Sequence, residues 1–144
     1  MKIDFKGITA EELSFKLNRV RLSPDAKLDI KPQFTRQVRK VNNNEKLNFI
    51  ALSVKIESTE EEPKPFDLHV TLVGVFETEF VSDSEERSFV IEGTKLLYPY
   101  LRSTVTNLTA NAYVAPLNLP IITGPIFPED RDVYGFTVGN DPIN

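Results

Sequence analysis

The fold is decided by the stretch Leu96-Leu-Tyr-Pro-Tyr-Leu-Arg-Ser-Thr-Val-Thr-Asn-Leu-Thr-Ala-Asn-Ala112, which is followed by Ala115-Pro-Leu-Asn-Leu-Pro120. Apolar residues recur in it at steps of three and four, a spacing that stacks side chains along one face of an α-helix. Pro116 and Pro120 then end the helical pattern in extended chain. The stretch therefore predicts one long helix with an inward apolar face, made of Leu97, Leu101, Val105, Leu108 and Ala112.

Before this helix, four segments alternate apolar and polar residues, which is the period of a half-buried β-strand. They cover residues 13–17, 28–38, 50–56 and 66–76, after an extended start at residues 3–8 and a turn or a single helical turn at residues 9–12. Breaks in the alternation at Arg19 and Gly74 predict β-bulges. Because three connections of hairpin length join the strands, we expect an antiparallel meander. A short helix should begin at Asp83, reach about Ile91 and stop at Gly93.

The chain of 144 residues has the size of a single domain, residues 1–144. A strong helix behind a run of strands predicts an α+β fold: a four-stranded antiparallel sheet, a long helix and an irregular C-terminal tail. Past Pro120, glycines and prolines exclude another long helix, yet apolar residues continue as far as Val138. We therefore expect the tail to pack on the rest of the protein.

The overall charge argues against nucleic acid as the main partner. The formal net charge is -4 and the pI is near 5.1, whereas binding of phosphates requires a concentrated basic face. Basic residues in the first third, among them Arg36 and Arg39, are assigned to the solvent face of strands. The chain has no cysteine and no apolar run long enough to span a membrane. We expect a cytoplasmic protein without membrane insertion.

Residues suited to catalysis are scarce. The only histidine, His69, falls on the polar face of a strand, where catalysis would require a neighbouring nucleophile and an orienting acid. The acidic run from Glu60 to Glu62 is typical of a solvated loop. The sequence has no phosphate-binding glycine loop and no nucleophile elbow. We expect no enzymatic activity, no cofactor and no metal, and a small hydrolase remains the least favoured alternative.

Apolar residues are in excess in the loop before the second strand and in the tail. Two interpretations stay open: a satellite core beneath a long tail, or an exposed groove that binds other proteins. The candidate groove consists of Leu28, Ile30, Ile121, Ile122, Ile126, Phe127, Tyr134 and Phe136.

The helix stretch resembles the signature of the SecB protein-export chaperones. The similarity rests on Leu97-Tyr-Pro-Tyr-Leu-Arg-Ser, on the Ser/Thr/Asn-rich helix after it and on Pro116-Leu-Asn-Leu-Pro, with a weaker match at Glu12-Leu-Ser-Phe. It covers residues 1–122, so residues 123–144 form an extension that lacks the second helix of the family. The resemblance implies an ATP-independent chaperone that holds unfolded or precursor polypeptides. It also implies a homotetramer, a dimer of dimers, with a candidate interface of Leu97, Tyr100, Leu101, Val105 and Leu108.

In the export chaperones, a negatively charged sheet face binds the motor protein SecA. The corresponding positions here are Glu12, Lys16 and His69, so one acid is kept and one charge is reversed. We therefore expect SecA to bind weakly or not at all. Two alternatives to an export chaperone stay open: a SecB-like chaperone of a toxin–antitoxin system, whose client is the antitoxin, and an adaptor or structural module that has the same fold without client binding.

Overall fold

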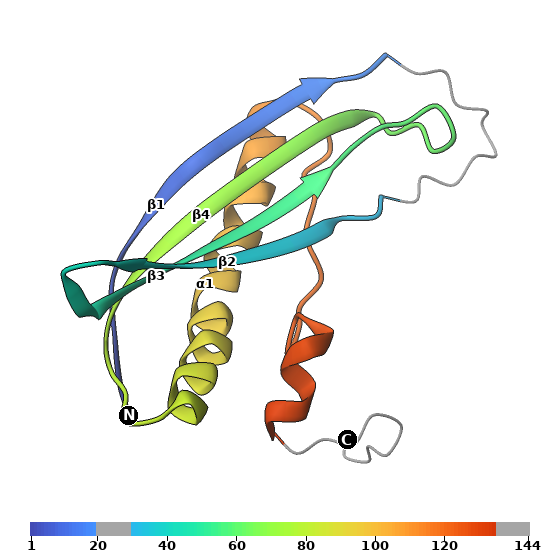
Figure 1. The fold of residues 1–144 in the computed structure, drawn as a ribbon. Coiled ribbons are helices and arrows are strands. Elements are labelled where there is room, and N and C mark those ends of the chain that lie inside the picture. The colour runs from blue at the N-terminus through green and yellow to red at the C-terminus, as the bar shows by residue number, and fades with distance from the viewer. Residues whose placement is uncertain (20–29, 135–144) are drawn as a thin grey trace.

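The structure, a computed structural model, describes residues 1–19 and 30–134 and consists of one sheet with a long helix and the tail on one of its faces (Figure 1). This architecture confirms the predicted α+β fold with a four-stranded antiparallel sheet. The elements, in chain order, are β1 (Lys2–Leu17), β2 (Gln33–Val41), β3 (Asn44–Ile56), β4 (Phe66–Glu79), α1 (Asp83–Asn111) and the 3-10 helix η1 (Pro128–Tyr134).

The strand order is β1-β4-β3-β2, which corrects the expected meander. The β2–β3 and β3–β4 connections join neighbouring strands, but β1 pairs with β4, so β1 and β2 lie at opposite edges of the sheet. Aromatic contacts fix this arrangement, because Phe5 stacks on Phe76 and Phe15 packs on Phe66, both across the β1–β4 pair. The result is a Greek-key order of strands.

β1 is one continuous strand, so the turn expected at residues 9–12 is wrong. The register shifts between Phe5 and Gly7 and again between Ala10 and Glu12, which makes the irregularities bulges within a paired strand. The bulge expected at Arg19 falls beyond the end of β1. The bulge expected at Gly74 is wrong, because Gly74 keeps a regular register with both β1 and β3. The missing side chain of Gly74 makes room for the Phe76 ring, which lies 2.8 Å from where a Cβ of residue 74 would be.

α1 is one helix from Asp83 to Asn111. The prediction that a short helix stops at Gly93 is wrong, because the helix continues through this residue. Ser82 is the N-cap of the helix: its hydroxyl accepts a hydrogen bond from Glu85 N at 3.2 Å, while the Glu85 carboxylate accepts one from Val81 N at 3.0 Å. Gly93 is buried against β3, where its missing side chain lets the helix approach the sheet. The core lies between α1 and the sheet, and its fully buried members include Ile50, Leu52, Val70, Phe76, Phe89, Leu97 and Leu101.

Candidate functional site

The chain after α1 returns alongside the helix, and we call residues 116–130 the tail segment (Figure 1). Its apolar side chains pack against the core: Leu119 is buried, and Leu117, Ile122 and Ile126 are half-buried. The prolines and glycine of the segment hold it extended, so its backbone forms no hydrogen bonds of a regular helix before η1. The tail segment is therefore part of the folded protein, as expected from its apolar content.

A row of polar side chains on α1 binds the backbone of the tail segment. Tyr98 donates its hydroxyl to the Pro120 carbonyl oxygen at 2.6 Å, and Arg102 Nε donates to the Leu119 carbonyl oxygen at 2.6 Å. Burial raises the pKa of the Tyr98 phenol, which keeps it protonated as a donor.

One and two turns further along the helix, Thr106 and Thr109 continue the row at Leu117. The Thr106 hydroxyl lies 3.1 Å from the Leu117 carbonyl oxygen, and Leu117 N donates to Thr109 Oγ1 at 2.8 Å. These contacts go to main-chain atoms, which every residue type supplies. We call Tyr98, Arg102, Thr106 and Thr109 the polar row.

The second attachment of the tail segment is an ion pair between β2 and η1, which we call the Arg36 clamp. Arg36 donates to both carboxylate oxygens of Asp130, at 2.6 and 3.0 Å, and to Thr94 Oγ1 of α1 at 3.2 Å. The Arg36 Cζ atom also lies 4.5 Å from the centroid of the Phe127 ring. With 12% and 8% of their side chains exposed, Arg36 and Asp130 form a nearly buried bidentate pair.

Sequence reasoning missed the clamp because it assigned Arg36 to the solvent face. Arg36 occupies an even position between Phe34 and Val38, and both of these pack against the core. The alternation along the strand places Arg36 on the same face as these two core residues, and this pattern could have predicted that Arg36 faces the core. Arg39, at an odd position, does lie on the opposite face, where it forms a bidentate pair with Glu11 at 2.6 and 2.9 Å.

The residues of the candidate groove lie at different depths. Phe127 is buried, Ile30, Ile122 and Ile126 are half-buried against the core, and Ile121 is 77% exposed. A cavity of about 200 Å³ remains between α1 and the tail segment, lined by Lys95, Tyr98, Pro99, Ile122, Thr123, Gly124 and Ile126. Leu28 and Phe136 lie outside the described residues, and Tyr134 ends η1. Phe127 therefore belongs to the core and Ile121 to the surface, and a groove that binds other proteins stays a prediction.

The candidate interface residues also divide. Leu97, Leu101 and Val105 are fully buried against their own sheet, which removes them from any contact with another protomer. The helical period explains this correction, because these three residues form the inward stripe. Tyr100 is half exposed and Leu108 is half-buried.

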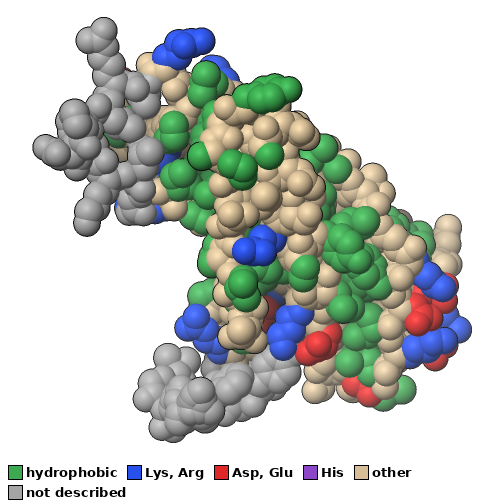
Figure 2. All heavy atoms as spheres, turned by 180° about the vertical axis from the view of Figure 1, so that it is seen from behind, with side chains coloured by type: hydrophobic (Ala, Val, Ile, Leu, Met, Phe, Trp, Pro, Cys, Tyr) green, Lys and Arg blue, Asp and Glu red, His purple; other side chains and the backbone are tan. Residues whose placement is uncertain are grey.

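On the β1 side of α1, apolar side chains are left uncovered within the protomer, as the view onto this face shows (Figure 2). Leu13 pairs with the buried Val70, so it points to the same face of the sheet as the core, yet it is 53% exposed. On the helix side, Tyr100 of α1 contacts Phe5 of β1 edge to face. We call the exposed set the β1–α1 surface: Ile8, Leu13, Leu17, Leu96 and Tyr100.

The three residues of the predicted docking face come together on the other face of the sheet. His69 Nδ1 lies 3.1 Å from Glu12 Oε1, and Lys16 is paired in register with Asp67, two residues before His69. Ser14 donates to Glu12 at 2.7 Å and lies beside them. A shallow cavity of about 350 Å³ is lined there by Ser14, Phe15, Lys16, Lys55, Ile56, Glu57, Asp67, Leu68 and His69.

Asp67, which is paired with Lys16, lies on the same face and lines the same cavity. It accepts hydrogen bonds from Ser58 N at 2.9 Å and from Asn18 Nδ2 at 3.0 Å. The bond from Ser58 N, aided by the one from Asn18, holds the pKa of the Asp67 carboxyl below its ordinary value of 3.8.

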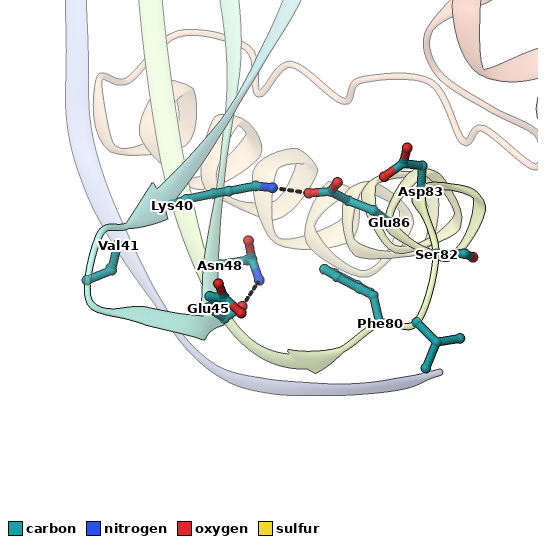
Figure 3. Close-up of a pocket in the computed structure, with 9 residues that line it drawn as sticks. Lys40, Val41, Glu45, Asn48, Phe80, Ser82, Asp83 and Glu86 are labelled. Atoms are coloured by element: carbon teal, nitrogen blue, oxygen red, sulfur yellow. Dashed lines mark hydrogen bonds and ion pairs between the residues drawn. The ribbon is translucent and has the colours of Figure 1, made fainter.

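A further cavity, of about 540 Å³, lies between the β2–β3 hairpin and the first turn of α1 (Figure 3). Lys40 reaches across it to form an ion pair with Glu86. The buried Asn48 donates to Thr78 Oγ1 at 2.6 Å. Its lining mixes charged groups with Val41, Phe80 and Val81, and includes none of the residues predicted from the sequence.

Within residues 1–19 and 30–134, no three His, Cys, Asp or Glu side chains are grouped so that they could hold a metal ion. No helix in that part of the chain is long and apolar enough to cross a membrane.

Comparison with known proteins identifies the family. The family model described as preprotein translocase subunit SecB matches residues 3–124. The chain therefore belongs to the SecB family, and the resemblance found in the sequence is confirmed. The uncharacterized protein MJ0357 of Methanocaldococcus jannaschii is 30% identical over 124 residues, which cover 83% of this chain and 78% of that protein.

Among solved structures, the chain is similar to the Rv1957 SecB-like chaperone of Mycobacterium tuberculosis, in complex with a ChAD peptide from the Rv1956 HigA1 antitoxin. The TM-score is 0.70 at 18% identity, and the match covers 86% of this chain and 93% of that one. At this identity the likeness is one of fold.

Proposed function

We propose that the protein is an ATP-independent chaperone that holds extended, non-native polypeptide segments beside α1. The observation that carries the proposal is how α1 binds the tail segment. The polar row contacts the main chain of residues 117–120, while apolar side chains of the tail pack against the core. Main-chain binding combined with apolar packing suits a surface that must accept many sequences.

The affinity expected of such a surface is moderate. Burial of one large apolar side chain of a client contributes about 1.5–3 kcal/mol. The cost of ordering a flexible client offsets much of this gain, so a few contacts support loose, sequence-tolerant binding. A holding activity of this kind needs no nucleotide, which agrees with membership of the SecB family.

The proposal is tested by diluting a chemically unfolded protein into buffer and following its aggregation by light scattering without nucleotide. The protein should delay aggregation, and Ile30→Asp or Ile122→Asp should weaken the delay, because each places a charge on a half-buried apolar position. Tyr113→Asp is the matched control, since the Tyr113 side chain is 96% exposed and lies outside the candidate groove. A folded wild-type protein that never delays aggregation would favour an adaptor module instead.

Export of precursor proteins and protection of an antitoxin are two settings for the same activity. The second is favoured by the fold shared with Rv1957, which is bound to an antitoxin peptide. If the antitoxin is the client, genes for a toxin–antitoxin pair should lie beside the gene for this protein. Co-expression should then keep that antitoxin in the soluble fraction, and expression of the antitoxin alone should leave it aggregated or degraded.

We further propose that the protein forms a homotetramer, a dimer of dimers, and that the β1–α1 surface is one of its two interfaces. β1 is an edge strand that pairs only with β4 in the described part of the chain, which leaves its other side open. Exposed apolar side chains next to an open edge are a liability that association between protomers removes.

A further inference from the structure

We propose that Arg36 is a carboxylate receptor, which selects client segments that carry an apolar or aromatic residue followed three positions later by an acidic residue. The tail segment, with Phe127 and Asp130, would be an internal ligand of this receptor. The inference rests on the proposed function and deepens it, because it names the chemistry of the polypeptides that are held.

The receptor is built from two elements that do not belong to the tail. Arg36 projects from β2 toward α1, and Thr94 Oγ1 of α1 accepts a hydrogen bond from it at 3.2 Å, which orients the guanidinium. Thr94 is itself fixed, because its hydroxyl lies 2.6 Å from the Val90 carbonyl oxygen. A guanidinium held in this way presents a planar fork that matches any carboxylate.

The tail supplies both halves of the ligand from one turn. Asp130 N donates to the Phe127 carbonyl oxygen at 3.0 Å, so the first turn of η1 places both side chains at the same guanidinium. The Asp130 carboxylate binds the edge of Arg36 at 2.6 and 3.0 Å, and Arg36 Cζ lies over the Phe127 ring, 4.5 Å from its centroid. The receptor therefore recognises an apolar or aromatic residue and an acidic residue that lie three positions apart in a tight turn.

The receptor requires an anion. With 12% of its side chain exposed, Arg36 would be a nearly buried charge without a counter-ion if Asp130 moved away. Such a state is strongly unfavourable, so a client that displaces the tail must replace its carboxylate. The cavity of about 200 Å³ between α1 and the tail segment shows that the tail leaves this surface incompletely filled.

The test uses the full chain as wild type, as Asp130→Asn and as Glu129→Gln, a matched control at the adjacent exposed acid. The probe is a labelled peptide with the sequence of residues 121–131 and an amidated C-terminus, together with its Asp130→Asn form. Binding is followed by fluorescence anisotropy, and the melting curve of each chain is recorded so that only folded chains are compared.

The Asp130→Asn chain should bind the acidic peptide about tenfold more tightly than the wild-type and Glu129→Gln chains, because its own tail no longer competes. The same chain should bind the Asp130→Asn peptide about tenfold more weakly than the acidic one, as expected for loss of a charged pair. Adding Arg36→Gln to the Asp130→Asn chain should abolish the difference between the two peptides.

Equal binding of the two peptides to the Asp130→Asn chain would overturn the inference, and so would equal binding of the acidic peptide to all three chains. These results are separable from the proposed function. A chain that delays aggregation but does not distinguish the peptides retains the holding activity without a carboxylate receptor. A chain that distinguishes the peptides but never delays aggregation has the receptor without the chaperone function.

Discussion

Gly93 of α1 lies directly against Ile50 of β3, so closely that a Cβ on Gly93 would be 2.6 Å from Ile50 Cδ1. The rings of Phe76 and Phe89 would lie 3.4 Å from the same Cβ. Ile50 and both rings are fully buried, so none of them has free space to move into. The distance between the helix and the sheet is set by this contact.

Gly93→Ala should therefore destabilise the protein by about 1–3 kcal/mol through overpacking, although alanine is intrinsically the better helix former by about 1 kcal/mol. The free energy of unfolding in urea measures this change. A more stable Gly93→Ala variant would show that helix propensity outweighs packing at this position.

The cause of the destabilisation can be isolated with Ile50→Val, which removes the Cδ1 atom nearest to residue 93. In the Ile50→Val background, Gly93→Ala should cost less than it does in the wild type. A double-mutant cycle with no coupling between the two positions would contradict the assignment.

Tyr100→Glu should lower the mass of the assembly from that of a tetramer of 16.3 kDa protomers to that of a smaller species, without lowering its melting temperature by more than a few degrees. Half of the Tyr100 side chain is exposed in the protomer, so the charge disturbs an association surface more than the core. Light scattering measures the mass at micromolar concentration. Tyr113→Glu is the matched control, because Tyr113 is 96% exposed just beyond the end of α1.

A wild-type protein that is already a monomer in this measurement would contradict the proposed tetramer. A tetramer that Tyr100→Glu leaves intact would place the association surface elsewhere on the protomer.

SecA should bind weakly, and Lys16→Glu should strengthen the binding. Lys16 lies with Glu12 and His69 on the open face of the sheet, where an acidic replacement restores negative charge. Binding is measured at low and at physiological salt, with Lys6→Glu on the same strand as the control. Strong, salt-sensitive binding of SecA that Lys16→Glu does not change would mean that this face is not the docking surface.

Asp67→Asn should destabilise the protein by about 1 kcal/mol at neutral pH, because the carboxylate accepts hydrogen bonds from Ser58 N and Asn18 Nδ2. The pKa of Asp67 is lower in the folded protein than its ordinary value of 3.8, so its contribution is present above that value and is lost as the pH falls through the folded pKa. Urea unfolding of both proteins between pH 7 and pH 3 checks this. A difference that stays constant over the whole range would show that charge has no part in it.

The sequence predicted the local elements well, because strands and helix carry their own periods. It predicted Gly93 as a helix end, since glycine disfavours helix in isolation, whereas the contact with Ile50 is a property of two distant segments. The pairing of β1 with β4 was missed for the same reason: the stacking of Phe5 on Phe76 joins residues far apart in the chain.

For the candidate site, too, local patterns were predictable from the sequence and contacts between distant segments were not. The sequence located apolar residues of the tail, but their depths depend on which of them α1 and the sheet cover, so Phe127 is buried and Ile121 is exposed. The Arg36 clamp was missed because its partner Asp130 lies at the other end of the chain. The polar row was within reach of pattern reasoning, since Tyr98, Arg102, Thr106 and Thr109 recur at helical spacing.

The strand order has a consequence for synthesis of the protein on the ribosome. β1 is made first, but its partner β4 begins only at Phe66, after β2 and β3 have been made. At about 5–20 residues per second, β1 therefore waits for several seconds without a partner. Throughout that interval the nascent chain exposes the apolar side of β1, so a protein proposed to shield other unfolded chains itself passes through a stage at which its first strand needs shielding.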